Sequence, residues 1–111
     1  MDSATWDALD RIVDWLDHES RLPPGEEKLL RILKVTEEAG EAAQAVLGAT
    51  GQNPRKGTTH TWTDVEHELC DVVFAALIAL RTLTPDARTV FADRLAHVTT
   101  RPRQPAAPEQ T

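Results

Sequence analysis

Residues 69 to 80 form the segment that constrains the fold most. Asp71 is its only residue that is not apolar. A helix over this stretch carries apolar side chains on every face, so other helices or another subunit must cover it on most sides. The stretch is shorter than the roughly 20 residues that a membrane-spanning helix needs, and it includes a carboxylate. It therefore predicts a helix, over about residues 63 to 83, in the middle of a bundle or at a subunit interface.

Two further helices are expected before this one. Residues 3 to 19 place apolar side chains at every third or fourth position, and residues 25 to 49 carry a wide apolar face. Two consecutive prolines break the chain between them, and Gly48 and Gly51 mark the end of the longer helix. No stretch alternates in the way that is typical of a half-buried strand.

The last two helices have recognisable starting points. Thr63 followed by Glu66 is typical of a capping box, in which each side chain satisfies a backbone N–H of the first turn. Thr84 followed by Pro85 is typical of an N-cap and the first residue of a fourth helix, which we expect to end near residue 99.

The size of the chain allows one domain with a single core. Of the 111 residues, 41% are hydrophobic but only 5% are aromatic, so the core must be mainly aliphatic. We expect an all-α domain over residues 1 to 100, in which four helices form a bundle around two long antiparallel members. Residues 101 to 111 contain three prolines and almost no apolar bulk, and are expected to form a disordered tail.

The charge of the chain limits its partners. A net charge of −6 argues against a nucleic-acid polymer or an anionic membrane as the main partner. It still allows a small phosphorylated ligand beside a bound metal ion. The single Cys70 cannot form an internal disulfide, and no basic segment followed by an apolar run opens the chain. We therefore expect a soluble cytoplasmic protein.

Five acidic residues lie in two short clusters on the two longest expected helices. Glu37, Glu38 and Glu41 form the pattern E-E-x-x-E, and Glu68 and Asp71 form E-x-x-D. Residues three apart lie on one helix face, so two adjacent helices bring four carboxylates together. Such carboxylates repel one another unless a cation binds, and oxygen ligands suit Mg²⁺ or Mn²⁺. Glu38 and Glu41 differ by about 60° around their helix, and Glu68 and Asp71 differ by the same angle around theirs. This match favours these four residues as the metal ligands. Glu37 would orient an attacking water.

The acidic clusters also have simpler interpretations. The three glutamates could form a solvated helix face, on which Lys34 pairs with Glu38. Asp71 is harder to explain in this way, because an unpaired carboxylate is costly to bury in an apolar helix. A metal ion would compensate that charge. The alternative is an ion pair with one of three arginines: Arg31, Arg81 or Arg94.

The residues around the clusters resemble a known family. The run from Lys34 to Glu41, K-V-T-E-E-A-G-E, is similar to the K-x-x-E-E-x-G-E motif of the MazG-like nucleoside triphosphate pyrophosphohydrolases, and E-L-C-D-V-V from Glu68 is similar to their E-L-x-D-V. The resemblance covers about residues 6 to 102. It implies a four-helix MazG-like bundle and Mg²⁺-dependent hydrolysis of a (deoxy)nucleoside triphosphate to the monophosphate and pyrophosphate, as in the removal of non-standard nucleotides. Glu37 and Glu38 would be catalytic.

The same resemblance extends to the fourth helix. Arg94-x-x-His97, followed by Pro102, is similar to the family's K-x-x-N…P ending, whose Lys and Asn bind substrate. Here Arg and His replace them, and His does not offer the paired donor and acceptor of an amide. A basic last turn that complements the helix dipole is the alternative interpretation.

Four more residues are candidate substrate contacts. Lys34 belongs to the first motif. Arg55 and Lys56 lie in the loop between the motif helices, where they could reach a triphosphate, cover the site or simply keep the loop soluble. Trp62 could stack on a base or could act as a hydrophobic staple for the third helix.

The wide apolar faces of the second and third helices exceed what one short bundle can cover. We therefore expect a homodimer or homotetramer. Two functional alternatives stay open. The first is a phosphoribosyl-ATP pyrophosphohydrolase-like enzyme, since that activity shares the superfamily and the motif. The second is a non-catalytic helical interaction module that has retained the fold.

Overall fold

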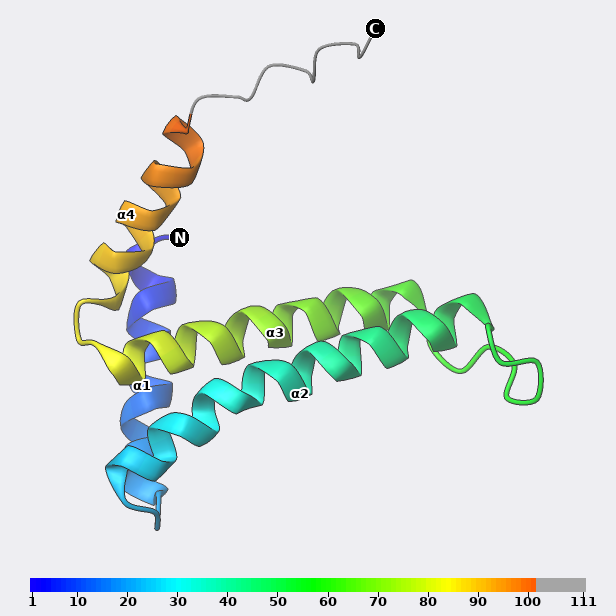
Figure 1. Cartoon of the computed structure of the whole chain (residues 1–111), viewed down its shortest axis with the longest axis horizontal. Helices are drawn as coiled ribbons and strands as arrows, with labels where there is room; N and C mark the ends of the chain where they lie inside the picture. Colours follow the sequence, from blue (N-terminus) through cyan, green and yellow to red (C-terminus); the bar gives the residue numbers. More distant parts are fainter. Residues whose placement is uncertain (102–111) are drawn as a thin grey trace, which may run out of the picture.

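The computed structural model describes residues 1–101, which form four α-helices and contain no strand (Figure 1). The helices are α1 (Ser3–Glu19), α2 (Pro24–Thr50), α3 (Trp62–Leu83) and α4 (Ala87–Thr100). The all-α prediction is confirmed for this range. The predicted tail falls almost entirely on residues 102–111, which lie outside the described residues. None of the four helices combines the length and apolarity that a bilayer span requires.

The two long helices, α2 and α3, run antiparallel as a hairpin (Figure 1). The loop of residues 51 to 61 joins the two helices at the closed end of the hairpin, and α2 begins and α3 ends at its open end. Helix α1 crosses the open end and packs on α3. Helix α4 also contacts α3 at this end but then projects away from the hairpin. The predicted long antiparallel helices are therefore confirmed, whereas in a single chain the four helices do not close into one bundle.

Helix α3 begins earlier than the sequence pattern predicts. The Thr61 hydroxyl accepts the Asp64 backbone N–H at 3.1 Å, and the Asp64 carboxylate accepts the Thr61 backbone N–H at 2.8 Å. This is a capping box with Asp in place of Glu. The prediction of a box at Thr63 and Glu66 is wrong because this earlier pair already satisfies the helix terminus. As a result, Trp62 lies in the first turn of α3.

Helix α4 begins later than predicted. Thr84 and Pro85 do not open it; the Thr84 hydroxyl instead accepts the Asp86 backbone N–H at 3.1 Å and closes a short turn. The helix then starts at Ala87, with Asp86 as its N-cap residue. The proline therefore forms part of the connection between α3 and α4.

The core lies where α1 and α4 meet the open end of the hairpin. Trp6 and Leu9 of α1 pack there with Leu77 of α3 and Ala87 of α4. The ring of Phe91 approaches the Trp6 ring edge-on, with centroids 6.0 Å apart. Since these residues come from three helices, this cluster fixes the directions in which α1 and α4 leave the hairpin.

The opposite half of the hairpin is held together by small residues. Ala42, Ala45 and Gly48 of α2 are buried there, as is Val65 of α3. Small side chains let the two helix backbones approach closely, which also brings together the longer polar side chains beside them.

Much of the apolar surface of α2, α3 and α4 stays exposed in one chain. Leu69, Val73 and Phe74 of α3 are each about half exposed, and Leu33 of α2 is 62% exposed. The expectation that the apolar helix lies in the middle of a bundle is therefore wrong for a single chain. The alternative, a subunit interface, stays a prediction.

Arg31 is the only charged residue that is buried among residues 1–101, with 7% of its surface exposed. Its Nε donates to Glu27 at 3.0 Å, and its Nη1 donates to Asp17 at 2.7 Å and to the Thr82 hydroxyl at 3.0 Å. These partners lie on α2, α1 and α3, so one guanidinium joins three helices. Arg81 forms a more exposed pair with Asp10 at 2.7 Å.

We expect Arg31→Met to lower the free energy of unfolding by about 2 kcal/mol, because it removes charge-assisted hydrogen bonds to three helices and leaves Glu27 half-buried without its cation. The matched control is Arg81→Met, which removes an exposed pair and should cost about 1 kcal/mol or less. Urea denaturation of both variants measures the difference. Equal losses of unfolding free energy in the two variants would show that the burial of Arg31 adds nothing to stability.

Candidate metal centre

Three of the predicted ligands meet midway along the hairpin. Glu38 and Glu41 come from α2 and Glu68 from α3, and one carboxylate oxygen of each lies within 4.8 Å of the others. Glu38 is only 14% exposed because it lies on the side of α2 that faces α3, in line with Ala42 and Ala45. We call these three residues the acidic cluster.

Two features of the acidic cluster bear on whether its residues could hold a cation. Glu68 Oε2 is buried and has no hydrogen-bond partner among the described residues. The pKa of Glu38 is raised, first by burial, then by the nearby Glu41 carboxylate and more weakly by Asp71, while Lys34 acts in the opposite direction. Three hard oxygen donors with one oxygen unsatisfied fit a divalent cation of the Mg²⁺ type.

Asp71 does not belong to the acidic cluster in this structure. It is exposed, although its charge still contributes to the raised pKa of Glu38. The expectation of a buried Asp71 is wrong for one chain because the apolar residues beside it are also exposed. The alternative of an Asp–Arg pair is not seen among residues 1–101. Arg31 and Arg81 bind other carboxylates, and Arg94 forms no ion pair with Asp71.

Glu37 is not one of the three residues of the acidic cluster, and it is 57% exposed. Lys34 Nζ lies 3.1 Å from Glu37 Oε1 and 3.6 Å from Glu38 Oε1. The predicted pairing of Lys34 with Glu38 is therefore present, but the contact with Glu37 is shorter. These contacts raise the pKa of Lys34, and they place one ammonium group at the edge of the acidic cluster.

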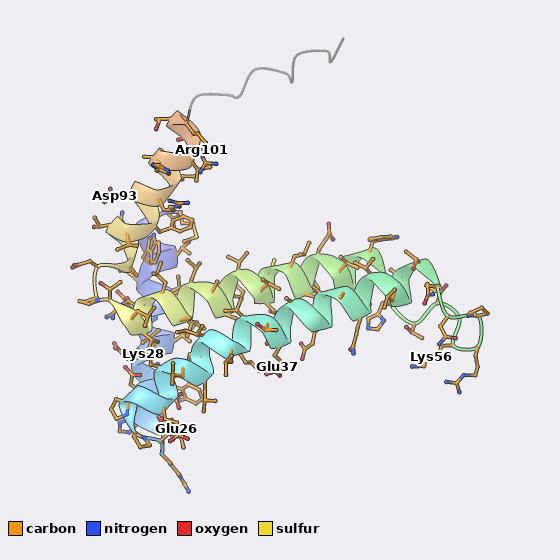
Figure 2. The ribbon with its side chains drawn as sticks, in the orientation of Figure 1. Glu26, Lys28, Glu37, Lys56, Asp93 and Arg101 are labelled. Atoms are coloured by element: carbon orange, nitrogen blue, oxygen red, sulfur yellow. The ribbon has the colours of Figure 1, made fainter. Side chains whose placement is uncertain are left out.

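The remaining candidate substrate residues lie far apart in one chain. Arg94 and His97 are exposed on α4, which projects away from the hairpin (Figure 1). Lys56 lies in the loop at the closed end, beside Arg55 (Figure 2). Trp62 is 59% exposed on the first turn of α3 and lines no described pocket. Of these five, Lys56 alone lines one of the two cavities described below, through the loop that folds back on α2.

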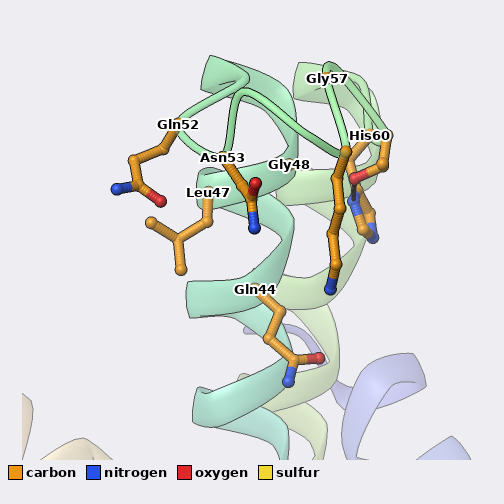
Figure 3. Close-up of a pocket in the computed structure, with 9 residues that line it drawn as sticks. Gln44, Leu47, Gly48, Gln52, Asn53, Gly57 and His60 are labelled. Carbon is orange, nitrogen blue, oxygen red and sulfur yellow. Dashed lines mark hydrogen bonds between the residues drawn. The ribbon is translucent and has the colours of Figure 1, made fainter.

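Two cavities flank the acidic cluster along the hairpin. One, of about 360 Å³, lies at the closed end and is lined partly by Gln44, Lys56 and His60 (Figure 3). The other, of about 380 Å³, lies toward α1 and is lined mainly by apolar residues, with Lys34 at one side. The sequence predicts a loop between the two motif helices but does not reveal the closed-end cavity, because the cavity forms only when that loop folds back on α2.

The chain matches no protein-family model, no curated protein and no solved structure. The likeness to the MazG-like enzymes therefore rests on the two motifs. What the site does must be inferred from its own geometry.

Proposed function

We propose that the protein is an Mg²⁺-dependent nucleotide pyrophosphohydrolase of the MazG-like type. One observation carries the proposal: two antiparallel helices bring three carboxylates within 4.8 Å, and one of their buried oxygens has no partner among residues 1–101. A site of this kind is costly without a cation and well suited to Mg²⁺, with Mn²⁺ as the second candidate. Mg²⁺ would neutralise charge on the phosphate oxygens and orient a water.

The residues around the acidic cluster have separate roles in this proposal. Glu38, Glu41 and Glu68 hold the cation, and Asp71, one turn beyond Glu68, completes the set from the exposed side. Lys34 donates hydrogen bonds to a phosphate oxygen. Water attacks the α-phosphorus, the bond from that phosphorus to the bridging oxygen breaks, and pyrophosphate leaves. Glu37, beside Lys34, accepts the proton that the water releases.

A homo-oligomer, a dimer or a tetramer, is part of the same proposal. The exposed apolar side chains lie on α2, α3 and α4, and include Leu33, Val73, Phe74 and Leu95. Water-exposed apolar area on this scale is typical of an interaction surface. Arg94 and His97 would need a second copy to act on substrate, because α4 leaves the hairpin of its own chain (Figure 1).

A panel of NTPs and dNTPs tests the activity. The full-length protein with Mg²⁺ is expected to release pyrophosphate and the matching monophosphate from at least one of them, and to lose the activity when EDTA is added. Release of orthophosphate instead would contradict the assigned bond cleavage. Turnover of phosphoribosyl-ATP alone would favour the second enzyme. If no compound turned over and calorimetry detected no Mg²⁺ or Mn²⁺ binding, the protein would be a non-catalytic module.

A further inference from the structure

The cavity at the closed end of the hairpin has an unusual lining. Three carboxamides surround it, from Gln44 on α2 and from Gln52 and Asn53 in the loop, and Leu47 contributes an apolar surface (Figure 3). His60 lies across from them (Figure 3), and Lys56 also lines the cavity. The pocket thus offers neutral donors and acceptors beside an apolar patch, with one ammonium group.

The wall of this cavity is held by a tight return of the loop. The Thr59 backbone N–H donates to the Gly48 carbonyl at 3.0 Å, and a Cβ at Gly48 would overlap the His60 ring and the Thr59 hydroxyl. Gly51 takes the left-handed conformation, with φ of 67°, that ends α2 and turns the chain back. The glycine at position 48 is therefore required for His60 to reach the cavity.

Several hydrogen-bonding groups at the cavity are available to a ligand. The Gln44 and Gln52 side chains form no hydrogen bond with residues 1–101. The Asn53 side-chain oxygen accepts the Arg55 backbone N–H at 3.0 Å, which leaves its amide nitrogen as a donor. His60 Nδ1 lies 2.9 Å from the Thr59 hydroxyl, so Nε2 is the ring atom left for other contacts.

The cavity lies next to the acidic cluster. Gln44 follows Glu41 by three residues, which is about 4.5 Å along α2 and about 60° around it. Gly48 follows by one further turn and lies on nearly the same face as Glu41, at a helical angle about 20° away. A ligand that places a phosphate at the acidic cluster therefore places its next group, one sugar away, beside Gln44, at the edge of the cavity nearest the cluster.

We propose that this closed-end cavity binds the nucleobase of the substrate, and that Gln44 and Gln52 select the base. The inference rests on the proposed function. A carboxamide pairs a donor with an acceptor and so can match the edge of a base, while Leu47 and the His60 ring offer surfaces for its flat faces. Three carboxamides and one ammonium suit a neutral base better than a further phosphate.

The second cavity, toward α1, lacks groups of this kind. Its polar side chains are Glu27, Arg31 and Lys34, and all three already form ion pairs. The other lining residues are the apolar Leu16, Leu30, Ala75 and Ile78. This cavity can accept an apolar group but has no neutral donor or acceptor with which to tell one base from another.

The test is a comparison of base selectivity between Gln44→Met and the wild type, using kcat/KM for the four NTPs with Mg²⁺. Methionine keeps the length and helix propensity of glutamine but removes its hydrogen bonds. We expect about a tenfold loss on the preferred nucleotide, a smaller loss on the others and unchanged Mn²⁺ affinity. Leu30→Ala, in the other cavity, should leave the order of bases unchanged. An equal loss on all bases, or a changed order in Leu30→Ala, would overturn the assignment.

A binding measurement separates this inference from the proposed function. Nucleosides without phosphates are titrated into the ¹⁵N-labelled full-length protein without metal, and the side-chain amides of Gln44 and Gln52 are followed by NMR. Shifts of both signals in the wild type, with the Gln52 shift lost in Gln44→Met, support the base pocket even if no triphosphate is hydrolysed. If triphosphates are hydrolysed but no nucleoside moves these signals, the base pocket is wrong and the proposed activity stands.

Discussion

Glu38→Gln is expected to lower Mg²⁺-dependent pyrophosphate release by at least about 100-fold, the size of loss that follows removal of one electrostatic group from an active site. The same variant should be more stable than the wild type when no metal is present. Glu38 has a raised pKa, so its ionised form is disfavoured by the fold at neutral pH, and a neutral amide removes that cost. Steady-state kinetics and thermal unfolding measure the two effects.

The opposite signs of the two effects make this prediction specific. In the wild type, Mg²⁺ should raise the midpoint of thermal unfolding, because it binds the folded state only. In Glu38→Gln that increase should be largely lost. Glu66→Gln is the matched control, since Glu66 is an exposed glutamate two residues from Glu68 and outside the acidic cluster, and it should behave like the wild type. Retained activity in Glu38→Gln, or a metal-free stability below that of the wild type, would contradict the proposed centre.

The helices were largely predictable from sequence because their signals are local. Apolar periodicity located the first two helices, and an apolar run and cap signals located the last two; the first helix, residues 3 to 19, has the expected bounds. The errors concern competition between nearby caps. Thr61 with Asp64 and Thr63 with Glu66 are both plausible capping pairs, and only the path of the incoming loop decides between them.

The sequence predicts which carboxylates lie near the metal centre, but not which of them face the other helix. Spacing shows that Glu38 and Glu41, or Glu68 and Asp71, share a helix face, yet it does not show which member of each pair faces the other helix. In the structure Glu38 and Glu68 are the less exposed members, while Glu41 and Asp71 lie toward solvent. Asp71 was expected to be buried because its neighbours are apolar, and in one chain those neighbours are uncovered.

Long-range contacts were outside the reach of sequence patterns. Arg31 was considered as a partner for Asp71, but it binds Asp17 on α1 instead, because the crossing of α1 over the hairpin brings that carboxylate to it. The closed-end cavity depends likewise on the return of residues 57 to 60 against the last turn of α2. The only sequence signal of this close contact was Gly48, a glycine within a run of residues that otherwise favour a helix.

The second large effect concerns assembly. We expect light scattering to give a mass of about 25 kDa or more, that is, at least two copies of the 12.3 kDa chain. The apolar side chains that one chain leaves uncovered include Leu69 and Val73, four residues apart on one face of α3, and Leu29 and Leu33, similarly placed on α2. Burial of each such side chain in an interface contributes about 1.5–3 kcal/mol, so several together favour association strongly.

Val73→Glu places a charge in the middle of this apolar surface. If the surface is an interface, an unpaired carboxylate there is costly, so the variant should scatter as a single chain or dissociate at much higher concentration than the wild type. Thr89→Glu, at an exposed position on α4 that is already polar, is the matched control and should keep the wild-type mass. A wild-type mass of 12.3 kDa would show that α3 tolerates its exposed apolar face without a partner. In that case Arg94 and His97, which project away from the hairpin, could not act on a substrate held there.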